Sequence, residues 1–247
     1  MHVPRVTPRR STMDTSSPRK LLSAIRRALR NRFPLCYGMR GTAPINPAFG
    51  SAEGTPVDRF YIERFLDRER ARITGTVLEI GDRGYTERFG GGVTRSDVLS
   101  AAADEGVTYV GDLASCPEIP SDTYDCVVLT QTLHYLRNMS AGVSELARIL
   151  KPGGSVLCTV PGISQVSRFD MDRWGDRWRL TSLSAKELFS ESFAPEDVSV
   201  DTYGNALASV CFLQGVPAER ISQTKLDRQE PDYQLIVAVR ATKARHA

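Results

Sequence analysis

The chain of 247 residues is 41% hydrophobic and 25% charged, and its formal net charge is +3. These values fit one globular domain of ordinary to large size. No apolar run approaches the roughly 18 residues that span a bilayer, and no secretory leader is visible. We therefore expect a cytoplasmic protein rather than a membrane-spanning or secreted one.

The charge is unevenly distributed, because residues 1–32 carry +8 and the remainder −5. Residues 1–17 are rich in Pro, Ser, Thr and Arg and are expected to be disordered. Residues 18–32 place apolar side chains on one helical face and arginines opposite, which predicts a basic helix. That helix either binds an anionic membrane or partner or docks on the domain with its arginines solvated. With the Pro- and Gly-containing linker that follows, it forms a segment at 18–54.

A second helix is predicted to begin at residues 55–58 (Thr-Pro-Val-Asp) and to run to about Arg72. Thr is a good N-cap, Pro suits the first helical position, and an acidic residue follows in the first turn. A buried parallel strand is predicted at 76–81, where an apolar run that contains Glu79 ends at a glycine. Glycine at that end allows the backbone to approach a ligand closely.

Further apolar segments alternate with helical ones along the chain. Strands are predicted at 92–98, 107–110, 124–130, 155–160, 198–203 and 233–240. One helix is predicted at 140–150, before the turn Lys-Pro-Gly-Gly, and another from Ser184, where Ser-Ala-Lys-Glu forms a capping box. This alternation indicates a doubly wound α/β sheet.

Four motifs occur in the order found in a known family. They are VLEIGDRGY at 77–85, the acidic residue Asp97, GDL at 111–113 followed by YDCVVLTQTLHYL at 124–136, and ILKPGG at 149–154. On this ordered set the chain resembles the class I S-adenosylmethionine-dependent methyltransferases. The resemblance implies a Rossmann-like domain at 55–241, with an N-terminal helical extension and a tail at 242–247. Its mostly parallel sheet would have the strand order 3-2-1-4-5-7-6, with an antiparallel seventh strand at 233–240.

The resemblance also implies a position for S-adenosylmethionine, across the carboxyl ends of the first and fourth strands, where the strand order reverses. Gly81 and Gly84 would let the loop pass close to the methionine part of the cofactor. Glu79 would orient this loop and the cofactor's amino group. Gln131, after the fourth strand, would contact the methionine part.

Three further residues would bind the nucleoside. Asp97, near the predicted end of the second strand, would accept hydrogen bonds from both ribose hydroxyls. Asp112 would accept from the adenine amino group, and the backbone amide of Leu113 would face the ring. For each acidic residue the alternative is a solvated position in a loop.

The loop departs from the family's common G-x-G-x-G, because residues 81–85 read Gly-Asp-Arg-Gly-Tyr. The middle glycine is missing, and two charges enter the turn. One branch of the family combines this loop with a T-P-[VI]-D-R-[FY]-Y-I-E helix like residues 55–63. We therefore expect an altered cofactor posture rather than a loss of binding.

His134 is the candidate general base. The other two histidines, His2 and His246, lie in the termini, whereas His134 follows the fourth strand at the edge of the predicted cofactor site. An imidazole there could deprotonate a hydroxyl near neutral pH. The alternative is a histidine packed on the first turn of a helix.

Substrate contacts are expected from two segments outside the sheet. Arg59 and Tyr61 lie on the helix that begins at 55–58, and residues 169–179 hold Trp174 and Trp178 among charges of alternating sign. Aromatic faces together with carboxylates and guanidinium groups suit a polyhydroxylated acceptor. The alternative for residues 169–179 is a lid over the cofactor without sugar specificity.

No metal site is predicted. Asp170 and Asp172 could hold Mg²⁺, but two acidic residues spaced by one are weak evidence. The five cysteines lack metal-ligand spacing and are expected to be reduced thiols, two of them in buried strands.

These patterns favour O-methylation of a sugar or another small-molecule hydroxyl, with a small molecule or glycan as the partner. The alternatives are methylation of a natural product or peptide, and a non-catalytic module that binds the cofactor. A nucleic-acid substrate is not expected, because the domain is acidic and no Asn/Asp-Pro-Pro-[Tyr/Phe] motif follows the fourth strand. A homodimer is one option for the oligomeric state, which the sequence leaves open.

Overall fold

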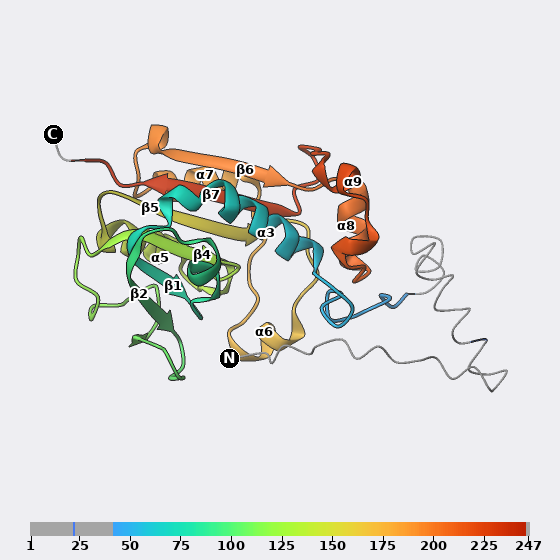
Figure 1. Cartoon of the computed structure of the whole chain (residues 1–247), viewed down its shortest axis with the longest axis horizontal. Coiled ribbons are helices and arrows are strands. Elements are labelled where there is room, and N and C mark those ends of the chain that lie inside the picture. The colour runs from blue at the N-terminus through green and yellow to red at the C-terminus, as the bar shows by residue number, and fades with distance from the viewer. Residues whose placement is uncertain (1–21, 23–41, 246–247) are drawn as a thin grey trace.

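The computed structural model describes Leu22 and residues 42–245 (Figure 1). The predicted disordered tail, the basic helix apart from Leu22, and residues 33–41 of the linker lie outside the described residues. The boundaries proposed for those segments therefore remain predictions. Among the described residues, no helix is long and apolar enough to cross a membrane.

Seven strands form one sheet in the order β3-β2-β1-β4-β5-β7-β6, which confirms the predicted doubly wound, Rossmann-like α/β fold. The strands are β1 (Gly75–Ile80), β2 (Val93–Ser100), β3 (Tyr109–Val110), β4 (Tyr124–Thr130), β5 (Leu150–Pro161), β6 (Val198–Tyr203) and β7 (Ile236–Thr242). β7 is antiparallel to both of its neighbours, and the other pairs are parallel. β1 lies between β2 and β4, so the strand order reverses at its carboxyl end.

Helices cover both faces of this sheet (Figure 1). The helices of four or more residues are α3 (Val57–Arg68), α4 (Gly84–Phe89), α5 (Met139–Ile149), α6 (Arg168–Arg173), α7 (Ser182–Ser190), α8 (Ala206–Leu213) and α9 (Gln223–Asp227). Successive side chains of a strand point to opposite faces. Val77 of β1 therefore packs in one core cluster with Tyr61 of α3, and Leu78 packs in the other with Val143 of α5 and Phe189 of α7.

Two helix starts differ from the prediction. α3 begins at Val57 with Pro56 before it, because the amide and hydroxyl of Thr55 donate to the Glu219 carboxylate instead of capping the helix. α7 begins earlier than predicted, at Ser182. Its cap is Thr181, whose hydroxyl oxygen accepts from the Ser184 amide while Ser184 returns a hydrogen bond to the Thr181 amide.

Candidate functional site

A cavity of about 760 Å³ opens at the carboxyl ends of the parallel strands. β1, β2, β4 and β5 each contribute their last residue to its wall: Ile80, Ser100, Thr130 and Pro161. The first turn of α3, the segment after β5 and the loops that follow β1, β2 and β4 also line it. The cavity therefore lies where the reversal of strand order places a ligand site in sheets of this kind.

Gly81, directly after β1, leaves room at the cavity. Its φ is 99°, a conformation that side chains rarely adopt, and no atom lies within 4 Å of the position that a Cβ would take. A ligand can therefore approach the backbone here more closely than at any residue with a side chain.

Glu79 connects β1 to α4. Its carboxylate is 2% exposed and accepts from the amides of Tyr85 (3.1 Å) and Thr86 (2.7 Å), in the first turn of α4. Burial raises the pKa of Glu79 to about 7, although these hydrogen bonds oppose the shift. Glu79 thus fixes the loop and also presents a carboxylate in the wall of the cavity.

The two charges of the variant loop have structural partners. The Asp82 carboxylate accepts from the Gly84 amide at 2.8 Å and closes the turn. The Arg83 guanidinium donates to the Gly106 carbonyl at 2.6 Å and joins this loop to the one after β2. These contacts hold the backbone path without the missing glycine. Gly81 lines the cavity, whereas Gly84 does not.

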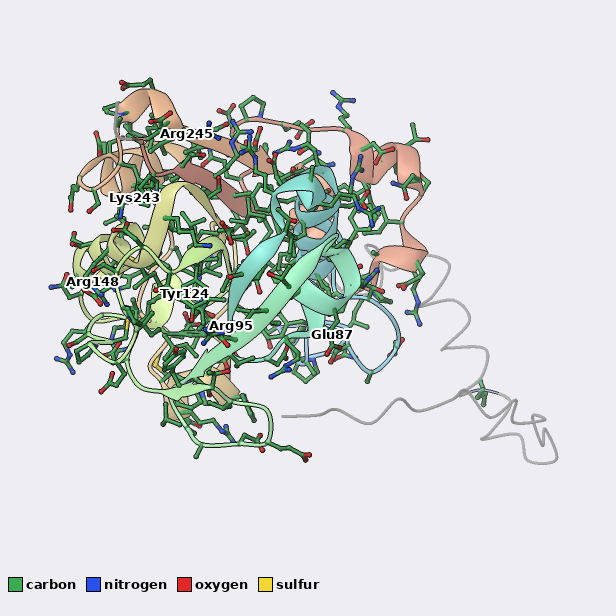
Figure 2. The ribbon with its side chains drawn as sticks, turned by 60° about the vertical axis from the view of Figure 1, so that its left-hand side comes forward. Glu87, Arg95, Tyr124, Arg148, Lys243 and Arg245 are labelled. Atoms are coloured by element: carbon green, nitrogen blue, oxygen red, sulfur yellow. The ribbon has the colours of Figure 1, made fainter. Side chains whose placement is uncertain are left out.

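Asp97 does not lie at the end of its strand, and the predicted position is wrong. β2 continues to Ser100, and Asp97 pairs with Leu78 inside the sheet. Its side chain is 7% exposed, and its carboxylate accepts from the Tyr124 hydroxyl at 2.8 Å and binds Arg95 through both oxygens, at 3.0 and 2.9 Å. Figure 2 labels both partners. Asp97 therefore has partners inside the sheet and lies outside the cavity wall.

The loop after β2 supplies residues that the sequence analysis missed. Ser100, Ala102, Ala103 and Asp104 all line the cavity. Asp104 is the first acidic residue after the strand and accepts from the Glu105 amide at 2.8 Å. Placing the end of β2 at Ser100 would have pointed to Asp104.

Asp112 and Leu113, beyond β3, lie outside the cavity wall. The Asp112 carboxylate is exposed and accepts from the Ala114 amide at 2.9 Å. Leu113 is 3% exposed and packs in the core cluster of α5 and α7. Their expected contact with adenine therefore stays a prediction.

Gln131 follows β4 and lines the cavity. Its φ of 47° is unusual for a residue with a side chain. The Gln131 amide donates to the Thr159 carbonyl at 2.9 Å, and its Nε2 lies 3.4 Å from the Thr159 hydroxyl. Neighbouring strand β5 therefore holds Gln131 in a conformation of the kind that functional sites often contain.

His134 lies in the cavity wall on a 3-10 turn, Leu133–Tyr135. Its side chain is 5% exposed, its Nε2 lies 3.9 Å from Asp176 Oδ1, and its Nδ1 has no hydrogen-bond partner among the described residues. Burial lowers the pKa of His134 to about 4; the Asp176 carboxylate opposes this shift and Arg179 adds to it. The imidazole is therefore neutral at pH 7.

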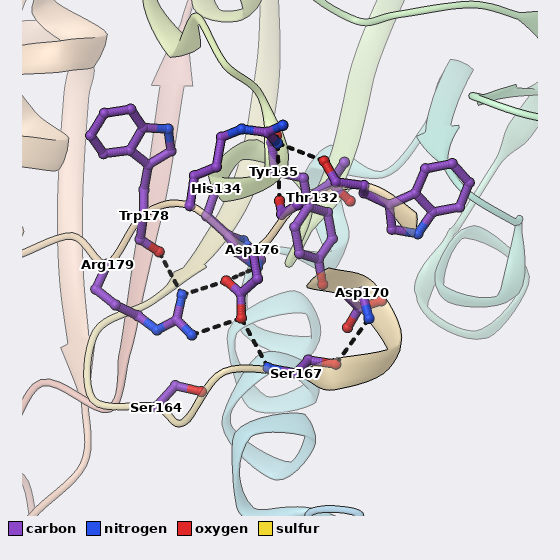
Figure 3. A network of polar contacts seen from close by, with 12 residues as sticks. Thr132, His134, Tyr135, Ser164, Ser167, Asp170, Asp176, Trp178 and Arg179 are labelled. Atoms are coloured by element: carbon purple, nitrogen blue, oxygen red, sulfur yellow. Dashed lines mark hydrogen bonds and ion pairs between the residues drawn. The ribbon is translucent and has the colours of Figure 1, made fainter. Parts of the chain in front are cut away.

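A segment after β5, residues 164–180, forms one side of the cavity and is called the lid segment below. Figure 3 shows its polar network. Asp176 accepts from Arg179 at 2.5 and 2.9 Å and from the Ser167 amide at 2.9 Å. The Arg177 amide donates to the His134 carbonyl at 3.3 Å, and Trp178 Nε1 donates to the Leu136 carbonyl at 2.9 Å.

Of the two predicted substrate residues of the lid segment, only one lines the cavity. Trp174 is 40% exposed and lines the cavity. Trp178 is similarly exposed but does not line it. Beside Trp174, the Tyr135 hydroxyl hydrogen-bonds to Asp170, and the Arg173 guanidinium covers the Phe169 ring at 3.4 Å from its centroid. These side chains give the cavity mouth an aromatic and charged wall.

The two predicted residues of α3 also separate. Arg59 is exposed and lines the cavity. Tyr61 is fully buried, and its hydroxyl donates to the Leu226 carbonyl at 2.9 Å, so the predicted substrate contact is wrong. The sequence contained a sign of this burial: Tyr61 lies four residues before Phe65, which places both rings on the core face of the helix. Asp58 lines the cavity instead, and burial raises its pKa to about 6.

A metal site is absent from the part of the chain that the structure describes, where no three His, Cys, Asp or Glu side chains are grouped to hold an ion. Asp172 pairs with Arg168 at 3.6 Å rather than joining Asp170. The four described cysteines are buried thiols.

Comparisons with known proteins match this geometry. A family model described as a methyltransferase domain matches residues 57–192. A solved S-adenosylmethionine-dependent methyltransferase from Archaeoglobus fulgidus is 14% identical, with 75% of this chain and 94% of that chain covered and a TM-score of 0.50. The carbon methyltransferase CurJ is 15% identical, with 80% and 57% covered and a TM-score of 0.51. At these identities the two structures show the fold alone. No curated protein matches the chain.

Proposed function

This chain belongs to the methyltransferase-domain family and is a class I S-adenosylmethionine-dependent methyltransferase, and from that premise we propose that it methylates a hydroxyl of a sugar or another small molecule. The observation that carries the proposal is His134, a buried, neutral imidazole in the cavity wall with an unpartnered Nδ1. A hydroxyl acceptor requires such a group, because its proton must be removed as its oxygen attacks carbon. A thiolate acceptor would have no need of it.

The residues at the end of β1 fit the methionine part of the cofactor. Gly81 offers open space where a side chain would lie, and Glu79 holds the loop and presents a carboxylate toward the cofactor's amino group. Gln131 forms the wall at the end of β4. In our proposal these three residues hold the methionine part. Gly84 acts through the loop conformation.

For the ribose we propose Asp104 in place of Asp97. Asp104 lines the same cavity as Gly81, on the loop next to the end of β2, and a carboxylate there can accept from ribose hydroxyls. The Ser100 hydroxyl, at the end of the strand, is a second polar group on this side. Asp112 remains the candidate for the adenine amino group.

The proposed step is an in-line displacement. Bound S-adenosylmethionine supplies an electrophilic methyl group, and its sulfur keeps the electron pair when the carbon–sulfur bond breaks. His134 Nδ1 takes the hydroxyl proton while the acceptor oxygen forms the new bond to the methyl carbon. The products are a methyl ether, S-adenosylhomocysteine and a proton carried by His134. The cavity wall aligns the acceptor and excludes water.

The wall at the cavity mouth supports a polyhydroxylated acceptor. Trp174 offers an exposed aromatic face, while Asp170 and Arg173 offer an acceptor and donors of hydrogen bonds beside it. Arg59 adds a second guanidinium from α3. A sugar presents both apolar ring faces and hydroxyls to such a wall.

The test is methyl transfer from labelled cofactor into a panel of sugars, glycans, peptides and small-molecule extracts, each with Mg²⁺ and with chelator. The proposal predicts label in an ether of a hydroxylated acceptor, with equal rates under both metal conditions. Label in a peptide or in an amine would contradict the acceptor class. Tight binding of S-adenosylhomocysteine without transfer to any acceptor would favour the rival function, a non-catalytic binding module.

A further inference from the structure

The imidazole of His134 faces a carboxylate from a distant part of the sequence. His134 follows β4, whereas Asp176 belongs to the lid segment after β5, and the two side chains are 3.9 Å apart between Nε2 and Oδ1. Their side chains are only 5% and 2% exposed. Because water is largely excluded from this contact, the charge of Asp176 acts on His134 with little screening.

Asp176 is held in one position and kept ionised. Its carboxylate accepts two hydrogen bonds from Arg179 and one from the Ser167 amide (Figure 3). Burial alone would raise the pKa of Asp176, but these hydrogen bonds and the charge of Arg179 hold it below its ordinary value. His134 therefore has a fixed negative charge beside it at neutral pH.

The charge of Asp176 also favours one of the two positions for the imidazole proton. An ionised carboxylate only accepts hydrogen bonds, so the neutral ring is favoured with its proton on Nε2, toward Asp176. Nδ1 then keeps its lone pair. This atom is buried and has no partner among the described residues, and His134 itself lines the cavity.

We propose that Asp176 is a positioning residue, which holds the His134 ring with Nδ1 as the proton acceptor and stabilises the imidazolium formed during methyl transfer. The proposal rests on the function proposed above. Asp176 and Arg179 are the charged groups that face the ring, and the Tyr135 ring packs against it at 4.0 Å between centroids. The base is thereby assembled from two segments, and it is complete only when the lid segment is docked on residues 133–136.

Nuclear magnetic resonance of the wild-type protein tests the tautomer directly, and a variant is needed only to assign the signals. The chain has three histidines, so ¹⁵N-labelled imidazole signals of His134 can be assigned by their loss in His134→Gln. We expect a neutral ring at pH 7 with its proton on Nε2, and a titration midpoint well below the ordinary value for histidine. A proton on Nδ1 would overturn the proposal.

Two substitutions that should shift the titration midpoint of His134 in opposite directions provide a second test. Asp176→Asn removes the charge that favours the imidazolium, so the midpoint of His134 should fall further, whereas Arg179→Met should raise it. In a plot of kcat/KM against pH, the acid limb should move to lower pH in Asp176→Asn and to higher pH in Arg179→Met. Asp176→Asn should lower kcat by about 10-fold or more with little change in the affinity for S-adenosylhomocysteine. Asp172→Asn, an exposed carboxylate of the same segment, is the matched control.

The outcomes separate this proposal from the function on which it rests. If Asp176→Asn leaves the midpoint and the acid limb unchanged, Asp176 is structural and the proposal fails, whatever the acceptor is. If the midpoints move as expected but His134→Ala retains the parental rate, Asp176 still positions the ring, and it is the role of His134 as base that fails.

Discussion

Carboxylates near the cavity fall into two groups, according to whether they line it. The Asp97 carboxylate accepts from Tyr124 and binds Arg95 inside the sheet. Asp104 and Asp58 line the cavity itself. Glu79 combines the two roles, because it accepts from the start of α4 and also lines the cavity. At this scale, exposure to the cavity rather than residue type separates the candidate binding residues from those that stabilise the sheet.

The contrast between two aspartates is testable. Asp97→Asn leaves Tyr124 and Arg95 without their buried carboxylate, and should lower the free energy of unfolding by about 1–3 kcal/mol. Asp104→Asn should leave that free energy unchanged and weaken the affinity for S-adenosylhomocysteine about tenfold. Urea denaturation and isothermal titration measure the two quantities. Reversed effects of the two variants would restore Asp97 as the ribose residue.

The raised pKa of Glu79 predicts a pH dependence of stability. The folded protein holds this proton to about pH 7, whereas the unfolded chain releases it near 4.5. Between these values the folded state binds more protons, so the free energy of unfolding falls as pH rises, by about 1 kcal/mol per pH unit at most. Urea denaturation of the cofactor-free protein from pH 5 to 8 measures this slope. Glu79→Gln should flatten it, and an equal slope in that variant would assign the effect elsewhere.

At the scale of elements, the turn from β1 to α4 determines how closely a ligand approaches. The strand ends at Ile80, Gly81 adopts a backbone conformation open to the cavity, and Asp82 and Arg83 fix the rest of the turn through Gly84 and Gly106. The lid segment acts from the opposite side by docking on the turn that carries His134. The site is thus formed between one rigid turn and one docked segment.

A methyl group at position 81 tests this turn. Gly81→Ala should cost about 1–3 kcal/mol of stability, because alanine is strained at a φ of 99°. It should also weaken S-adenosylhomocysteine binding at least tenfold, since the methyl group enters the open space. Gly91→Ala is the matched control, because its Cβ also meets no atom within 4 Å and its φ is not in the positive range. Equal affinity in the two variants would exclude a close approach at Gly81.

At the scale of the whole molecule, the central strands have a hydrophobic cluster on each face. Alternate residues of β1 and β4 enter the two clusters, and α3 and α8 cover one face while α5 and α7 cover the other. The cavity lies at the edge of the sheet where these buried strands end.

Removal of residues 1–32 tests whether the rest of the chain is enough for folding and for cofactor binding. The two clusters already cover both faces of the sheet with residues from position 57 onward. The truncated protein should therefore keep the thermal midpoint and the S-adenosylhomocysteine affinity of the full chain, measured side by side. An insoluble or unfolded product would show that the basic segment is integral to the fold.

The alternation of strands and helices could be predicted from the sequence, because apolar runs and glycine turns are local signals, whereas the strand order followed from the resemblance to the methyltransferase family. The position of Asp97 could not be predicted, because an error of two residues in the end of β2 moves its side chain from the edge of the sheet into its interior. The contact of Asp176 with His134 was equally hidden. It depends on how the lid segment folds back across the end of β4, and no local pattern encodes that path.

The most direct test of the account compares the initial rate of methyl transfer in the wild type and in His134→Ala. The rate is measured at saturating labelled S-adenosylmethionine, with the best hydroxylated acceptor of the panel. The account predicts label in an ether with the wild type and a rate about 100-fold lower or more in the variant, with cofactor affinity retained. Equal rates in the two proteins would contradict His134 as the base and would leave the unpartnered Nδ1 without a role in catalysis.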